Sequence, residues 1–190
     1  TVLGCGVMGY QSAQIANELG ASDVYAIDVV DQKLQHAADR GIHPIDATDT
    51  DPIEYIKSET GGVGSDIVYA SVGGTQSQER GNRPFDQAFE MVRKGGTVVQ
   101  VGHIIGDITI TPREMRSKCV DWVNPTKGTL SLSPNCDTGD LAAELVATDR
   151  ISISEFITHQ LDGLESFDEA VDITLDKAEY DALGPAQIKV

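Results

Sequence analysis

Residues 1–28, TVLGCGVMGYQSAQIANELGASDVYAID, contain the pattern from which the rest of the chain can be interpreted. Its parts follow in order: an apolar strand at 1–3, the glycines Gly4, Gly6 and Gly9, a helix pattern to about Leu19, a second strand at 24–27, and Asp28. A strand, G-x-G-x-x-G, a helix, a second strand and an acidic residue together form the fingerprint of a dinucleotide-binding unit.

Each glycine of this stretch has a physical role. Gly4 allows the tight turn out of the strand, and Gly6 lets a pyrophosphate approach the backbone. Gly9 lets the helix pack closely on the strands. We expect the amides of Val7 and Met8 to point at the phosphates, because a helix N-terminus attracts negative charge.

Asp28 predicts which dinucleotide is preferred. It lies about 20 residues after Gly9, where a carboxylate can accept both hydroxyls of an adenosine ribose. A 2′-phosphate would meet like charge there, so the sequence favours NAD over NADP. Two other interpretations stay open: a glycine-rich turn without a ligand, and a class I methyltransferase, whose glycine loop is usually spaced differently.

The composition is strongly acidic. The chain of 190 residues has 30 Asp and Glu against 14 Lys and Arg, a formal net charge of −16. Such a charge argues against nucleic acid and anionic membranes as partners. The acids are spread along the chain and Asp outnumbers Glu, which suggests a halophilic surface. An ordinary acidic protein is the alternative.

The cysteines and the hydropathy bear on compartment. Cys5, Cys119 and Cys136 are far apart, without a CxxC or an HExxH motif, so we predict no disulfide framework and no metal site. No apolar run reaches the ~18 residues of a membrane span, and no signal peptide is visible. We therefore expect a cytoplasmic protein.

Strands and helices alternate through most of the chain. We predict helices at 31–40, 53–59, 85–93, 112–118, 140–148 and 166–175, and strands at 43–45, 66–71, 97–101, 128–133, 151–157 and 188–190. This alternation predicts an α/β fold with a doubly wound parallel sheet, the Rossmann type. We expect Pro52 to open its helix, and Ser166 with Glu169 to form a capping box.

The alternation lapses near residue 150. We therefore expect a Rossmann domain at 1–150 and a small C-terminal segment at 151–190, too short to form its own core. The first strand has only three residues before Gly4, fewer than usual for a buried strand. We expect the chain to be a piece of a longer protein.

Taken together, these segments resemble the carboxyl half of medium-chain dehydrogenases of the zinc-type alcohol dehydrogenase family. The marks are GCGVMG with Asp28, GSDIVYASVGG, AFEMVRKGGTVVQVGH, KGTLSLS, and ITHQLDGLESFDEAVD followed by IKV. Each mark is modest, but their order and spacing are specific. The resemblance covers essentially the whole chain.

The resemblance implies a role for each matching position. Asp28 and Lys33 would hold the adenine-side ribose, and Ser71 and Val72 would border the nicotinamide ribose. The remaining assignments are these: Gly4, Gly6, Val7, Met8 and Gly9 on the pyrophosphate; Val101, Gly102 and His103 beside the nicotinamide; Thr129 and Ser131 facing its carboxamide; and Lys189 reaching the pyrophosphate. The family also pairs its late strand between subunits, which makes 128–133 the candidate dimer seam.

Two features lie outside these assignments. The polar loop at 72–84 could cover the cofactor or substrate, although a solvated loop with Arg80 and Arg83 exposed is the favoured interpretation. His103 could relay a proton, but we favour a role in lining the cleft.

The chain departs from the family in its metal sites. The catalytic zinc ligands of the family come from an amino-terminal domain with a Gly-His-Glu motif, which this chain lacks, as it lacks the cysteine quartet of the structural zinc. We assign no catalytic residue and no metal to this chain, and expect zinc only in a full-length protein.

The resemblance thus implies the NAD-binding portion of an enzyme that moves a hydride between NAD and an alcohol or its carbonyl. We expect the chain alone to be inactive. The alternatives are a zinc-free quinone reductase-like oxidoreductase and a non-catalytic nucleotide-binding or redox-sensing module. The resemblance also implies a small alcohol or aldehyde as the substrate.

Overall fold

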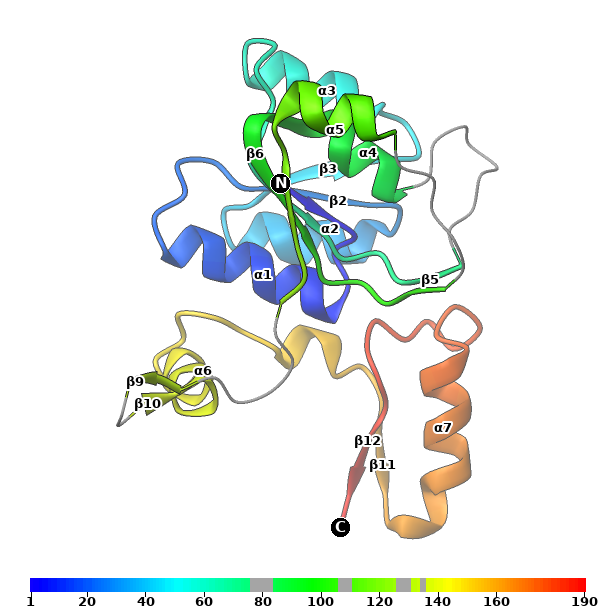
Figure 1. The fold of residues 1–190 in the computed structure, drawn as a ribbon. Helices are drawn as coiled ribbons and strands as arrows, with labels where there is room; N and C mark the ends of the chain where they lie inside the picture. Colours follow the sequence, from blue (N-terminus) through cyan, green and yellow to red (C-terminus); the bar gives the residue numbers. More distant parts are fainter. Residues whose placement is uncertain (76–83, 106–110, 126–130, 134–135) are drawn as a thin grey trace. The chain divides into compact units, whose positions relative to one another are not determined.

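The structure is a computed structural model that describes residues 1–75, 84–105, 111–125, 131–133 and 136–190 (Figure 1). Its contacts divide the chain into two compact units, Thr1–Thr138 and Gly139–Val190. The boundary predicted from the sequence lies near residue 150. The contacts instead divide the chain after Thr138, so all of α6 (Thr138–Ala147) except its first residue belongs to the second unit. The alternation of strands and helices does not reveal the unit with which a helix packs.

A six-stranded parallel sheet forms the centre of the first unit. Its order is β3-β2-β1-β4-β6-β8, and every adjacent pair is parallel. The strands are β1 (Val2–Leu3), β2 (Tyr25–Asp28), β3 (His43–Asp46), β4 (Ser65–Ala70), β6 (Val92–Gln100) and β8 (Asp121–Val123). The predicted doubly wound sheet is confirmed. Strand order reverses between β1 and β4, which is where such sheets bind their ligands.

Helices cover both faces of this sheet. Figure 1 shows α1 (Val7–Glu18) and α2 (Asp31–Asp39) on one face, and α3 (Pro52–Glu59), α4 (Pro84–Met91) and α5 (Pro112–Lys118) on the other. Apolar side chains from the strands and from α3 and α4 form a continuous core, including Leu3, Ile27, Ile56, Val68, Phe85 and Val98. Strands β1 and β2 are buried almost throughout, as expected of central strands that are covered on both faces.

Local signals in the sequence explain where α3 begins. Pro52 is the first residue of α3, as predicted, and the Asp51 carboxylate before it accepts hydrogen bonds from the N–H groups of Ile53 and Glu54. Such a cap satisfies backbone donors that the first helical turn leaves without partners.

Short strand pairs lie outside the main sheet. β5 (Gly74–Thr75) pairs in parallel with β7 (Ile104–Ile105), and β9 (Ser131–Ser133) pairs antiparallel with β10 (Cys136–Asp137). The predicted dimer strand at 128–133 falls partly outside the described residues, and the part that is described pairs within its own chain.

The second unit is small. Besides α6 it contains 3₁₀ turns η1 (Ser154–Phe156) and η2 (Leu164–Ser166) and helix α7 (Phe167–Leu175). Strand β11 (Gln160–Asp162) pairs in parallel with β12 (Gln187–Lys189). No helix in the described part of the chain is both long and apolar enough to cross a membrane.

Two sequence expectations for this unit are wrong. Residues 151–157 form no strand but lead into the 3₁₀ turn η1, because the Ser152 hydroxyl bonds the Glu155 carboxylate within the segment, at 2.5 Å. The capping box at Ser166 is also absent: its hydroxyl donates to the carbonyl of Asp162 at 2.7 Å and accepts no hydrogen bond from the first turn of α7.

Candidate dinucleotide site

A cavity of about 820 Å³ opens at the carboxyl ends of the parallel strands of the first unit. Six of the predicted site residues line it together: Gly4, Gly6, Asp28, Lys33, Ser71 and Val72. They come from the ends of β1, β2 and β4, three neighbours in the sheet, and from α2. The cavity therefore lies at the point where strand order reverses, as the fingerprint predicts.

The glycine loop is shaped by two close backbone approaches. Gly4 has a φ of +89°, and a Cβ there would lie 2.7 Å from Cγ2 of Val72. A Cβ on Gly9 would lie 1.9 Å from the carbonyl oxygen of Gly4, so α1 can cross β1 this closely only with a glycine. The fold itself requires both residues to be glycine.

Gly6 is different. It precedes α1 with φ −75° and ψ −170°, angles that any residue adopts, and a Cβ there would meet no atom within 4 Å. No contact of the described chain requires a glycine at this position. The empty space beside Gly6, at the start of α1, fits a ligand that approaches the backbone.

The start of α1 can hold an anion. The amides of Val7, Met8 and Gly9 belong to the first turn, whose N–H groups have no partner within a helix. No acidic side chain occupies this turn, and Gly6 provides no side-chain cap. The positive end of the helix dipole and the N–H donors of this first turn together favour a phosphate group.

Asp28 is held firmly at the end of β2. Its Oδ2 accepts a hydrogen bond of 2.7 Å from the Cys5 N–H, and its Oδ1 accepts from the N–H groups of Val29 and Val30 at 2.8 and 3.1 Å. The Lys33 ammonium lies 3.7 Å from Oδ1. Oδ2 keeps capacity for a further donor such as a ribose hydroxyl.

Cys5 lies under this loop and is buried. Burial, with the negative charge of Asp28 adding to it and Lys33 opposing it, raises the pKa of the Cys5 thiol to about 12. The thiol is therefore protonated at neutral pH and acts as a small apolar filler and not as a nucleophile.

The segments that follow β4 and β6 are joined by hydrogen bonds next to the cavity. The N–H groups of Val101 and Gly102 both donate to the carbonyl of Ala70, at 3.0 and 2.9 Å, and the N–H of Gly74 donates to the carbonyl of His103 at 2.8 Å. These bonds fix residues 101–103 beside the loop that follows β4, although they do not line the cavity itself. His103 is exposed.

For the remaining predicted residues the structure gives no position relative to the cavity. Thr129 lies outside the described residues, and so do Arg80 and Arg83. For Ser131 only the backbone is described, in β9. Lys189 belongs to β12 of the second unit, whose placement relative to the first is undetermined. Their predicted roles stay predictions.

One wall of the cavity was not predicted from the sequence. The loop between β3 and α3 contributes Ala47, Thr48, Asp49, Thr50 and Asp51, and the first residue of α3 contributes Pro52. A signal for it existed: β3 runs parallel to β2 with Asp46 opposite Asp28, so the loop after β3 must lie at the same edge of the sheet. Val29, Gly73, Pro84 and Gln87 complete the lining around the predicted residues.

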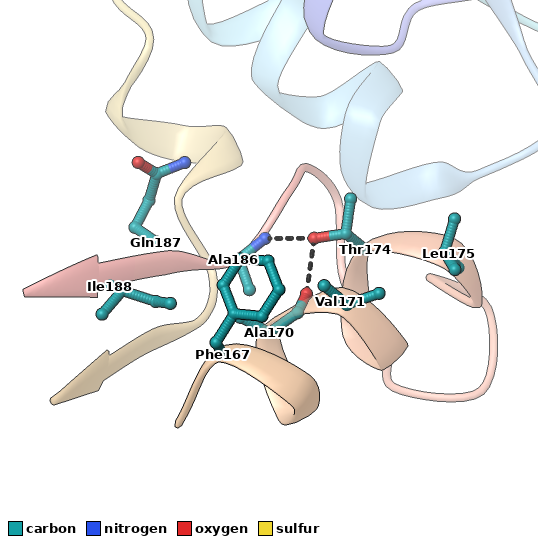
Figure 2. Close-up of a pocket in the computed structure, with 8 residues that line it drawn as sticks. All are labelled: Phe167, Ala170, Val171, Thr174, Leu175, Ala186, Gln187 and Ile188. Atoms are coloured by element: carbon teal, nitrogen blue, oxygen red, sulfur yellow. Dashed lines mark hydrogen bonds between the residues drawn. The ribbon is translucent and has the colours of Figure 1, made fainter. Parts of the chain in front are cut away.

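A second hollow, of about 460 Å³, lies in the second unit between α7 and β12 (Figure 2). Its lining is largely apolar, with Phe167, Val171 and Ile188 among the residues drawn. The Thr174 hydroxyl is already satisfied, since it donates to the Ala170 carbonyl and accepts from the Ala186 N–H. The hollow therefore offers little to a polar ligand, and the cavity at the glycine loop is the candidate site.

Among the residues that the structure describes, no three His, Cys, Asp or Glu side chains are grouped so that they could hold a metal ion.

Known proteins resemble this chain in sequence and in fold. The sequence profile of the family described as zinc-binding dehydrogenase matches residues 7–124. The D-xylulose reductase of Saccharomyces cerevisiae is 29% identical over 184 residues, covering 88% of this chain and 46% of that protein.

Solved structures agree with this match. An alcohol dehydrogenase from Thermus sp. ATN1 superposes with a TM-score of 0.77 and 26% sequence identity. The match includes 100% of this chain and 50% of the Thermus chain. A putative zinc-binding dehydrogenase from Sinorhizobium meliloti, solved bound to NADP, has a TM-score of 0.71 and 25% sequence identity. The match includes 90% of this chain and 46% of that protein. The chain thus spans about half the length of these relatives.

Proposed function

Since the chain belongs to the zinc-binding dehydrogenase family, we propose that it is the NAD-binding portion of a zinc-type alcohol dehydrogenase. The whole protein would interconvert a small alcohol and its aldehyde or ketone. The nicotinamide, when bound, supplies the carbon that accepts or donates the hydride, which no protein side chain can do. The role of this portion is to bind and orient the dinucleotide.

The proposed contacts follow the cavity from one strand to the next. Asp28 accepts hydroxyls of the adenine-side ribose and Lys33 lies beside them. The diphosphate is assigned to Gly4, Gly6, Val7, Met8 and Gly9, the second nucleoside to Ser71, Val72, Val101, Gly102, His103, Thr129 and Ser131, and a distal contact to Lys189. The wall at 47–52 would enclose the adenine end.

Asp28 carries the proposal that NAD is the preferred form. Its carboxylate lines the cavity with a side chain only 9% exposed, fixed by three backbone N–H groups. A 2′-phosphate would meet this charge at close range, and Asp49 and Asp51 lie along the same wall. The same charge disfavours the alternative of a quinone reductase-like protein that uses NADPH.

Fluorescence titration of the chain with NADH and NADPH tests this proposal. We expect NADH to bind at least about tenfold more tightly, since one repulsive charge pair is worth a kcal/mol or more in a partly buried site. Equal affinities, or tighter binding of NADPH, would overturn the NAD assignment. Repeating the titration in molar KCl tests the halophilic hypothesis, which predicts tighter binding at high salt.

The chain by itself is proposed to be inactive. The zinc that would polarise the substrate oxygen belongs to the part of the enzyme that this chain does not contain. An NAD-dependent alcohol oxidation rate that survives chelation and repurification of this chain would refute the proposal.

The second unit is proposed to complete the catalytic domain of the whole protein. Phe167 and Leu175 on α7 are 59% and 80% exposed and border the apolar hollow of Figure 2, which the other half of the protein would cover. We also propose a cytoplasmic homodimer that pairs through the strand at 128–133. Size-exclusion chromatography with light scattering of the longer protein tests the dimer.

A further inference from the structure

Helix α4 contributes a polar side chain to the cavity that no sequence motif marks. Gln87 and Pro84 both line the cavity and stand three positions apart, so they lie on the same side of the helix. Phe85, Ala88 and Met91 of the same helix are buried in the core, whereas Gln87 is partly exposed. The apolar side of α4 thus fixes the helix, and Gln87 is held where a ligand in the cavity can reach it.

The surroundings of Gln87 indicate which part of a dinucleotide it would meet. Figure 1 shows α3 and α4 on the same face of the sheet, and the two helices pack against each other. Pro52, the first residue of α3, lines the cavity beside the loop that follows β3. In the order of the strands, Asp28 on β2 stands between the glycine loop after β1 and this wall after β3. A base attached to the ribose on Asp28 would therefore extend toward the side that α3 and α4 border.

The groups on this side of the cavity suit a purine base. Val29, Ala47 and Pro52 offer apolar surface to its flat faces. A primary amide has an acceptor and two donors, so the side chain of Gln87 can bond at once to the amino group and to the neighbouring ring nitrogen N7 of an adenine. Hypoxanthine has a carbonyl oxygen in place of that amino group, and the same edge then offers only acceptors. An amide at this edge therefore distinguishes the two bases.

We propose that Gln87 selects the base of the dinucleotide; this rests on the proposed function. Its amide oxygen accepts a hydrogen bond from the adenine amino group, and its amide nitrogen donates to N7. Rotation about the side-chain bonds brings the amide to the base without any movement of the backbone of α4. Selection of adenine by Gln87 is thus separate from the selection against a 2′-phosphate, which is assigned to Asp28.

The test is a calorimetric titration of two pairs of ligands that differ only in the base: AMP with IMP, and NADH with reduced nicotinamide hypoxanthine dinucleotide. We expect the unaltered chain to bind the adenine member of each pair about three- to tenfold more tightly. Gln87→Leu, which keeps a similar volume without the amide, should bind both members of each pair equally. Gln87→Glu keeps an acceptor for the amino group and repels the carbonyl oxygen of hypoxanthine, so it should retain the preference for adenine.

Gln35→Leu is the matched control. The Gln35 amide donates to the Asp39 carboxylate at 2.8 Å on α2, and Gln35 is not among the described residues that line the cavity. This variant should keep the preference of the unaltered chain.

Three results would overturn the role of Gln87. They are equal binding of the two bases by the unaltered chain, a preference for adenine that persists in Gln87→Leu, and a loss of preference that appears with the dinucleotides but not with AMP and IMP. The last result would place Gln87 beside the second nucleoside. If the unaltered chain binds neither dinucleotide, the proposed function fails as well; if it binds them without regard to the base, only the role of Gln87 fails.

Discussion

The backbone N–H of Cys5 donates a 2.7 Å hydrogen bond to Oδ2 of Asp28, and this bond joins the glycine loop to the end of the neighbouring strand. The acid that would select the cofactor is thus also a structural partner of the loop that would hold its diphosphate. Substitutions at Asp28 are therefore expected to affect both the stability of the loop and the affinity for nucleotides.

Replacing Asp28 by Ala should reduce NADH affinity by about tenfold or more and narrow the difference between NADH and NADPH. It should also destabilise the chain by about 1–3 kcal/mol, because the N–H groups of Cys5, Val29 and Val30 lose their acceptor. Nucleotide titration and urea unfolding measure the two effects. Asp23→Ala removes the same charge outside the cavity, and a similar loss of selectivity there would contradict the role of Asp28.

The glycines of the loop should separate into two classes. Gly6→Ala should fold with a free energy of unfolding within about 1 kcal/mol of the unaltered chain, since its backbone angles are ordinary and its Cβ meets nothing within 4 Å. Its affinity for NADH should nevertheless fall. Gly9→Ala should lose about 3 kcal/mol of stability, because its Cβ would overlap the Gly4 carbonyl. Equal stabilities for the two variants would refute this distinction.

Periodicity and order of segments predicted most of the first unit. Helix α5 begins and ends where the sequence predicts, at Pro112 and Lys118, because proline opens it and its pattern is clear. The strands β8 and β11 were missed, since three residues are too few to show a period. The segment at 151–157 shows the opposite error, in which alternating Ile and Ser suggested a strand while local side-chain hydrogen bonds favour a turn.

The site was predictable where it depends on backbone and less so where it depends on neighbours. The glycine loop and Asp28 follow from spacing alone. The wall at 47–52 required knowing that Asp46 lies opposite Asp28, which follows from sheet order and not from any motif. The Ser71 oxygen has no hydrogen-bond partner among the residues that the structure describes. This could not be inferred from the sequence, because it depends on which atoms fail to come within reach.

Lys118 should stabilise the end of a helix to which it does not belong. Its ammonium donates to the carbonyls of Phe89, Glu90 and Val92, at 2.5, 3.1 and 3.3 Å, around the C-terminus of α4. Such carbonyls have no partner within the helix and favour a positive charge. Lys118→Met should lower the free energy of unfolding by about 1 kcal/mol in urea denaturation. Lys94→Met, at an exposed position nearby, should have little effect, and equal losses in the two variants would count against this role.

The buried thiol of Cys5 should make stability depend on alkaline pH. Its pKa is raised from 9.0 to about 12, chiefly by burial and next by the charge of Asp28. A raised pKa means that the folded state keeps its proton while the unfolded state loses it, so the contribution is fully present below pH 9 and is lost as the pH rises toward 12. Between pH 8 and pH 10 the unaltered chain should lose about 1 kcal/mol more stability than Cys5→Ala, measured by urea unfolding at each pH. Cys119→Ala, which alters an exposed thiol, should follow the unaltered chain. Parallel pH curves for the unaltered chain and Cys5→Ala would show that the thiol titrates normally and is accessible to water at the base of the site.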